Sequence, residues 1–121
     1  MLSEHLLPII IVVALCGAVM LYSTAANVAP VNCTSDAAAN AADVVMLSAT
    51  WCQYCRRARN YFVERGVNYC EWDIEKTQRG GELYSRSNIQ GIPIIYLGKE
   101  LLVGFSASEV AQALVAQELL P

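Results

Sequence analysis

Two cysteines three residues apart, Cys52 and Cys55, stand where a short apolar run meets a segment with helical spacing. The run 44–48 contains four apolar residues before a serine, which is typical of a buried strand. The segment 53–65 has apolar side chains at helical spacing, and Gly66 is a helix stop signal. The cysteine pair is therefore predicted at a strand–helix junction, and the first amides of the helix face it.

The segments after this junction continue to alternate between strand and helix signals. A strand is predicted over 67–74, a helix over 78–87, strands over 93–97 and 101–104, and a last helix over 106–120. Gly98-Lys99-Glu100 is a tight hairpin turn between the last two strands. Ser106 with Glu109 predicts a capping box. The β-α-β-α-β-β-α order predicts an α/β fold with one parallel pair and a closing antiparallel hairpin.

The N-terminal part of the chain has an apolar stretch without a charged residue from Leu6 to Ser35. Its densest part, 6–22, is just long enough to span a bilayer as a transmembrane helix. One interpretation is an uncleaved membrane anchor. The other is a signal peptide cut near Ala25 or Ala26, where small residues cluster. The absence of Lys or Arg before the run favours the anchor.

The sequence therefore predicts three parts of the chain. Residues 1–26 are the anchor or signal segment, 27–43 a linker, and 44–121 the domain. Within the linker, Ser35 before Asp36 and several alanines is a helix start signal. Neither flank of the anchor carries a Lys/Arg cluster that sets orientation. We take an extracytoplasmic domain on a single-pass anchor as the expected arrangement. The net charge of −3 argues against a nucleic-acid partner.

The position of Cys52 at a helix start has a chemical consequence. The first amides of a helix are unpaired and stabilise an anion, and a thiolate is an anion. Arg56 and Arg57 add positive charge within one turn. Cys52 is thus expected to attack a disulfide sulfur, and Cys55 to resolve the mixed disulfide that forms.

Metal binding is the alternative use of the same two cysteines. A structural zinc site needs four ligands, but the chain has no second Cys-x-x-Cys, and its only histidine, His5, precedes the apolar stretch. Binding of an iron–sulfur cluster or a soft metal between two copies of the chain is the remaining alternative, because a dimer supplies the thiolates of both copies. We expect no metal site within one chain and no tightly bound cofactor.

The tripeptide Gly91-Ile92-Pro93 opens a predicted strand. Proline is tolerated at the first residue of a strand, and an ordinary trans proline on an edge strand is one interpretation. The Cys-x-x-Cys lies about forty residues upstream in this strand order, which favours the other interpretation. In that case the Ile92–Pro93 bond is cis, and the backbone of Ile92 faces a substrate.

At this point the chain resembles the glutaredoxins, within the thioredoxin fold, from Val44 to about Ala113. The resemblance is carried by Thr50-Trp51-Cys52-Gln53-Tyr54-Cys55, by residues 68–75, by Gly91-Ile92-Pro93, and by Val103-Gly104-Phe105. It implies a reductase of protein disulfides or glutathione mixed disulfides. Cys52 is then the nucleophile, Cys55 the resolving thiol, and Pro93 the cis-proline.

Several residues differ from those common in glutaredoxins, and these differences bear on which molecule donates electrons. Glutaredoxins commonly have Pro where Gln53 stands, Lys where Ala49 stands, and acidic residues near Ala107. The electron donor is accordingly glutathione or a thioredoxin-type reductase, and the substrates are proteins with disulfides. Trp51 is expected to shape the substrate surface, with a buried aromatic as the alternative. The expected substrate-binding residues are Trp51, Tyr54, Ile92, Pro93, Gly104 and Ser106.

Cys33 and Cys70 have two interpretations of equal weight. They form an additional disulfide that ties the linker to the domain, which suits an oxidising compartment. Alternatively, Cys70 is a small buried apolar residue and Cys33 an incidental thiol. Sequence does not decide between them.

Overall fold

From residue 44 onward, the order of strands and helices is the predicted one. The structure, a computed structural model, describes residues 27–120. Its elements are α2 (Asp36–Ala41), β1 (Val44–Ser48), α3 (Gln53–Glu64), β2 (Tyr69–Asp73), α4 (Gln78–Ser87), β3 (Ile94–Leu97), β4 (Glu100–Val103) and α5 (Ala107–Ala116). The predicted last helix is too long: α5 ends at Ala116, and Glu118 adopts a left-handed φ of 57°.

The four strands form one mixed sheet in the order β2-β1-β3-β4. β1 pairs in parallel with β2 and antiparallel with β3, and β3 pairs antiparallel with β4. The β3–β4 turn contains Gly98 at φ 56°, a conformation that favours glycine. The predicted α/β class with both kinds of strand pairing is confirmed. β1, which leads into the Cys-x-x-Cys, is a central strand.

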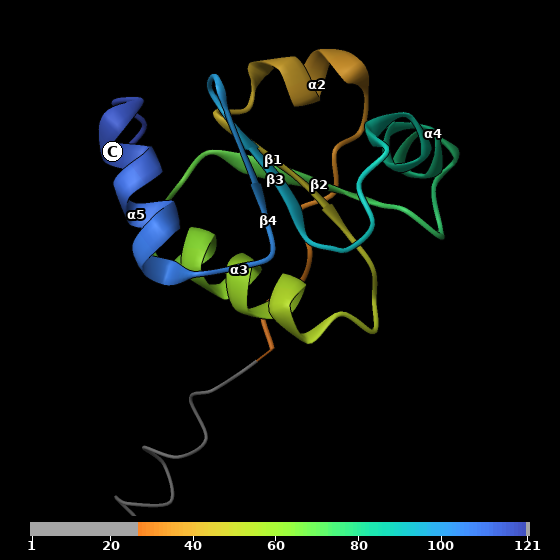
Figure 1. The fold of residues 1–121 in the computed structure, drawn as a ribbon, viewed down its shortest axis with the longest axis horizontal. Helices are drawn as coiled ribbons and strands as arrows, with labels where there is room; N and C mark the ends of the chain where they lie inside the picture. Colours follow the sequence, from red (N-terminus) through yellow and green to blue (C-terminus); the bar gives the residue numbers. More distant parts are fainter. Residues whose placement is uncertain (1–26, 121) are drawn as a thin grey trace, which may run out of the picture.

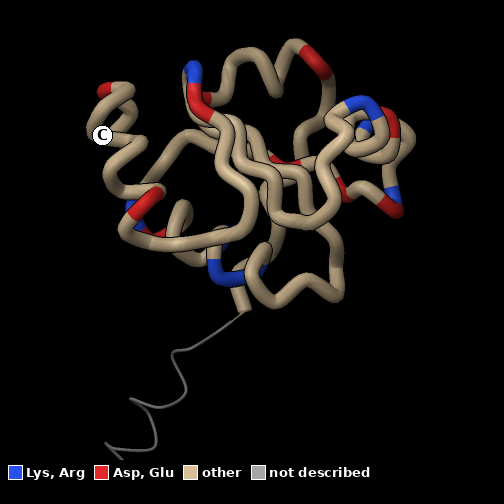
Figure 2. Tube along the Cα trace, viewed as in Figure 1, with Lys and Arg blue, Asp and Glu red and all other residues tan. Residues whose placement is uncertain are grey.

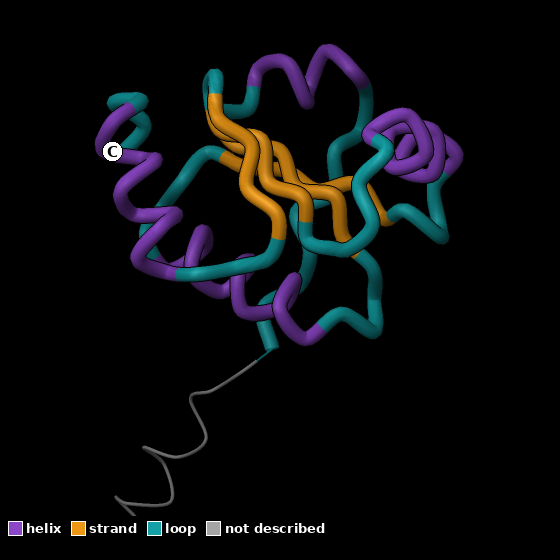
Figure 3. Tube along the Cα trace, in the orientation of Figure 1, coloured by secondary structure: helices purple, strands orange, loops and turns teal. Residues whose placement is uncertain are grey.

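Helices cover both faces of this sheet (Figures 1 and 3). Side chains alternate along β1, so that Val44 and Met46 point to one face and Val45 and Leu47 to the other. The first face packs against α3 and α5, with Phe62 and Leu114 fully buried. The second face packs against α2 and α4. The structure therefore places α3, with its cysteines, on the same sheet face as the larger apolar cluster.

The N-cap residue of α2, α4 and α5 is a serine or a threonine. Ser35 caps α2 by accepting a hydrogen bond from Ala38 N at 3.1 Å, as its helix start signal predicts. Thr77 caps α4 in the same way. The capping box predicted at Ser106 is wrong, because its hydroxyl lies 3.1 Å from Ser108 Oγ and makes no capping hydrogen bond.

The segment before α2 lies against the outer edge of β2. Glu71 N donates to Val31 O at 2.8 Å, and Cys33 N donates to Glu71 O at 3.0 Å. These bonds form a parallel bridge between Asn32 and Glu71. Cys33 and Cys70 are joined by a disulfide with a Cα–Cα distance of 5.0 Å. The structure therefore contains the disulfide, which was one of the two interpretations of these cysteines. The segment around Asn32 adds a short parallel bridge to the sheet at the outer edge of β2.

Removing this disulfide is expected to destabilise the domain. Cys33 and Cys70 are 37 residues apart, so their bond restricts a long loop in the unfolded chain. A loop of this length corresponds to about 3–4 kcal/mol. We therefore expect the double variant Cys33→Ala/Cys70→Ala to lose about that much in urea unfolding, with the Cys52–Cys55 pair unchanged. An unfolding midpoint equal to that of the wild type would contradict a stabilising role.

The predicted anchor is not tested by this structure. Segment 6–22 and Cys16 lie outside the described residues. Across residues 27–120, no helix combines the length and apolar character needed to cross a bilayer. The division into anchor, linker and domain stays a prediction.

Candidate active site

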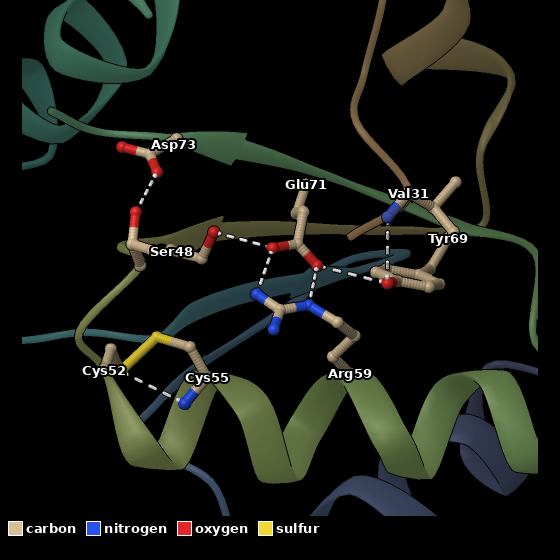
Figure 4. Close-up of polar contacts among 9 residues, drawn as sticks. Val31, Ser48, Cys52, Cys55, Arg59, Tyr69, Glu71 and Asp73 are labelled. Carbon is tan, nitrogen blue, oxygen red and sulfur yellow. Dashed lines mark hydrogen bonds and ion pairs between the residues drawn. A yellow bond between two sulfur atoms is a disulfide. The ribbon is translucent and has the colours of Figure 1, made fainter. Parts of the chain in front are cut away.

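Cys52 and Cys55 lie at the N-terminus of α3, where β1 ends. Cys52 is the N-cap residue of α3, and its Sγ accepts a hydrogen bond from Cys55 N at 3.1 Å. The two residues form a disulfide with a Cα–Cα distance of 5.2 Å (Figure 4). Cys55 is fully buried, whereas Cys52 keeps 6% of its surface exposed. A substrate approaching from solvent therefore meets Cys52 first.

Three other predicted site residues lie close to this pair. Ile92 packs against the buried cluster that contains Cys52 and Cys55. The Ile92–Pro93 peptide bond is cis. Gly104 N donates to Pro93 O at 2.8 Å, which joins the end of β4 to the start of β3. Gly104 has a φ of 82°, a conformation that favours glycine.

The two aromatic residues of the motif are exposed beside the cysteines. Trp51 is 71% exposed and Tyr54 is 54% exposed, so Trp51 is not a core residue. The Trp51 indole N–H donates to the Glu75 carboxylate. The guanidinium of Arg57 lies 5.2 Å from the Tyr54 ring centroid, within cation–π range. Both rings therefore offer apolar surface beside the Cys52–Cys55 motif.

Ser106 is the predicted site residue with the weakest structural link to the others. Its hydroxyl pairs with Ser108 rather than with a residue of the Cys-x-x-Cys, Pro93 or Gly104. Among residues 27–120, no group of three or more His, Cys, Asp and Glu side chains is arranged to hold a metal ion.

A buried network behind the cysteines was not predicted from the sequence (Figure 4). Arg59 lies one turn after Cys55 on α3, and Glu71 lies on β2. Arg59 Nη2 donates to Glu71 Oε1 at 2.6 Å, and Arg59 Nε donates to Glu71 Oε2 at 2.9 Å. The hydroxyls of Ser48 and Tyr69 donate to the same carboxylate at 2.9 and 3.1 Å. This network ties α3 to β1 and β2 beneath the Cys-x-x-Cys.

The electrostatic surroundings of this network change two pKa values. Burial, followed by the negative charge of Glu71, raises the pKa of Tyr69 to about 12. The hydrogen bond to Glu71 raises the pKa of Arg59, against the opposing effect of burial. Tyr69 therefore stays a hydrogen-bond donor and Arg59 a cation at neutral pH.

The sequence contains a signal for this network. Glu71 stands between Cys70 and Trp72 in the predicted strand, and in the structure only 2% of Glu71 is exposed. A buried carboxylate needs a cationic or hydrogen-bonding partner. Sequence reasoning used Glu71 only as part of a longer motif, and the choice of Arg59 as partner depends on how α3 packs on β2.

Comparisons with known proteins agree with this geometry. Residues 44–102 match the sequence model of the glutaredoxin family. A comparison with curated proteins finds no match.

Solved structures with the same fold include three redoxins of low sequence identity. The glutaredoxin-like protein NrdH-redoxin from Escherichia coli is 13% identical, with a TM-score of 0.52, over 57% of this chain and 91% of that chain. A glutaredoxin from Archaeoglobus fulgidus is 19% identical, with a TM-score of 0.53, over 60% and 86%. Buckwheat glutaredoxin in complex with glutathione is 18% identical, with a TM-score of 0.54, over 70% and 87%. These structures show an α/β thioredoxin-like fold. Residues 44–102 are similar to the glutaredoxin family model within that fold.

Proposed function

We propose that this protein reduces disulfides in proteins, or mixed disulfides of glutathione, through the Cys52–Cys55 dithiol. The observation that carries the proposal is the position of Cys52 as N-cap of α3, where its sulfur accepts the Cys55 N–H. Helix amides at this end stabilise the thiolate form of Cys52, which is the reactive species.

The proposed reaction has two exchange steps. The Cys52 thiolate attacks one sulfur of the substrate disulfide, forms a mixed disulfide and releases the other substrate sulfur as a thiolate. Cys55 then loses its proton and attacks the Cys52 sulfur, which releases the second substrate thiolate. Two electrons have then passed to the substrate, and Cys52 and Cys55 are left as the disulfide seen in the structure.

The direct test is reduction of insulin and of hydroxyethyl disulfide by the full chain. Dithiothreitol first reduces the Cys52–Cys55 bond and is then removed, so that only the protein supplies electrons. We expect one equivalent of substrate disulfide to be reduced per Cys52–Cys55 pair in the variant Cys33→Ala/Cys70→Ala, in which the other disulfide of residues 27–120 supplies no electrons. A protein whose dithiol is reduced but leaves both substrates unchanged would contradict the proposal.

The electron donor is proposed to be glutathione or a thioredoxin-type reductase. The glutathione-bound buckwheat structure supports the first, and exposed Tyr54 with the Ile92, Pro93 and Gly104 backbone offers a surface for the tripeptide. Ala49 and Ala107, where the family commonly has charged side chains, favour the second. The potential of Cys52–Cys55 separates them: about −200 to −230 mV supports glutathione, and about −270 mV a thioredoxin-type donor.

The proposed location is the outer side of a membrane, with residues 6–22 as a single-pass anchor. The uncharged run in the sequence supports the anchor. The Cys33–Cys70 disulfide supports an oxidising compartment, since such bonds are rare in reducing cytosol. Retention of the chain in the membrane fraction after carbonate extraction tests the anchor, and its release would contradict it.

A further inference from the structure

A cleft of about 600 Å³ lies on the β2 side of the cysteine pair, and its lining includes five charged side chains, Arg56, Arg59, Glu71, Asp73 and Lys76. The segment 27–30 forms part of its lining, and Thr50, Arg56 and Lys76 form another part. β2 and β3 lie on opposite sides of β1, so this cleft is separated from the Pro93–Gly104 surface by the central strand. Figure 2 shows basic positions on the first half of α3, close to where the described chain begins.

The uncompensated charge in this cleft is positive. Two of its charged groups, Arg59 and Glu71, are buried and neutralise each other. The Asp73 carboxylate accepts hydrogen bonds from the Thr50 hydroxyl at 3.2 Å and from the backbone N–H groups of Glu75 and Lys76 at 2.9 and 2.8 Å. The exposed side chains of Arg56 and Lys76 form no ion pair within residues 27–120. The neutral donors to Asp73 leave its charge in place, so the lining holds three cations, Arg56, Arg59 and Lys76, against the two carboxylates of Glu71 and Asp73. The net charge of +1 attracts an anionic group.

The wall formed by segment 27–30 is continuous with a fixed edge of the sheet. Hydrogen bonds join Val31 and Cys33 to Glu71, and the disulfide joins Cys33 to Cys70. Val31 N also donates to the Tyr69 hydroxyl at 3.4 Å. A wall held this way is formed before a ligand arrives, which lowers the entropic cost of binding.

We propose that this cleft binds an acidic peptide segment next to the disulfide of a protein substrate. The inference rests on the proposed function, because it assigns the class of substrate that Cys52 reduces. Thr50 and Arg56, which line the cleft, flank the Cys-x-x-Cys in the chain, so the cleft lies beside this motif. Aspartate or glutamate side chains of that peptide pair with Arg56 and Lys76. The volume lies within the range of binding sites of about 300–1,000 Å³.

The chain offers a matched pair of variants, because Lys76 and Lys99 are its only lysines. Lys99 is exposed in the β3–β4 turn and does not line the cleft. The probe is a fluorescein-labelled peptide that carries two glutamates beside an S-methylated cysteine, which cannot exchange with the Cys52–Cys55 disulfide, and a second peptide with glutamines in place of the glutamates. Binding to the oxidised full chain is measured by anisotropy, so that no catalytic step enters the result.

We expect the glutamate peptide to bind more tightly than the glutamine peptide. Lys76→Gln should raise the Kd of the glutamate peptide about two- to fivefold, as expected for one exposed ion pair. Lys76→Glu should abolish or reverse the preference, and Lys99→Gln should change nothing. High salt should weaken the preference, because exposed charges are screened.

Equal binding of the two peptides by the wild type, or equal effects of Lys76→Gln and Lys99→Gln, would overturn the inference. Neither result touches the proposed function, which is judged by reduction of the uncharged substrate hydroxyethyl disulfide. If the protein does not reduce hydroxyethyl disulfide but still prefers the glutamate peptide, the proposed reaction is wrong and the acidic-peptide site stands.

Discussion

Replacing Cys52 with serine is expected to lower the rate of disulfide reduction at least about 10³-fold. A serine hydroxyl at the N-terminus of α3 is protonated at neutral pH and does not attack sulfur. The fold should be kept, because serine is also a favourable N-cap residue. The measurement is the initial rate of hydroxyethyl disulfide and insulin reduction, with circular dichroism as a check on folding.

Replacing Cys55 with serine should give a different outcome, because this variant retains the nucleophile. Its Cys52 thiolate attacks the substrate, but no thiol follows to release the mixed disulfide. A covalent complex that disappears with dithiothreitol should therefore accumulate on non-reducing gels. The variant Cys33→Ala/Cys70→Ala serves as control, since it removes the other disulfide and keeps both active-site sulfurs.

If Cys52→Ser keeps wild-type activity, Cys52 is not the nucleophile. If Cys55→Ser forms no covalent complex with the substrate, Cys55 is not the resolving thiol. Visible absorbance in anaerobically purified protein, lost when Cys52 is replaced, would instead favour the metal-binding use of the same sulfurs.

The sequence was informative where a local pattern determines structure. The bounds of β1 and α4 agree with prediction. An apolar run marks β1, and the structure shows that Thr77 caps the start of α4. The N-terminal position of Cys52 on α3 follows from the same local signals. Contacts between distant segments were not predictable in this way. The sheet edge formed by segment 31–33 and the pairing of Arg59 with Glu71 depend on which surfaces meet after folding.

The Arg59–Glu71 ion pair provides the second large expected effect. Replacing Glu71 with leucine leaves the Arg59 guanidinium, 11% exposed, without its counter-charge. Breaking a buried pair from one side costs about 3–5 kcal/mol. The exposed pair between Arg79 and Asp36 has a similar separation of 2.7 Å but side chains 34% and 62% exposed. Asp36→Asn should therefore shift the midpoint of the same urea unfolding experiment far less than Glu71→Leu does.

A double variant separates the value of the ion pair from the cost of leaving one charge alone. Arg59→Met/Glu71→Leu removes both charges and fills the space with apolar groups, so it should be more stable than Glu71→Leu by about 2 kcal/mol or more. If Glu71→Leu is no more destabilising than Asp36→Asn, the carboxylate does not hold α3 to β2. If the double variant is as unstable as the single one, the loss comes from the hydrogen bonds of Ser48 and Tyr69 to Glu71 rather than from an unpaired Arg59.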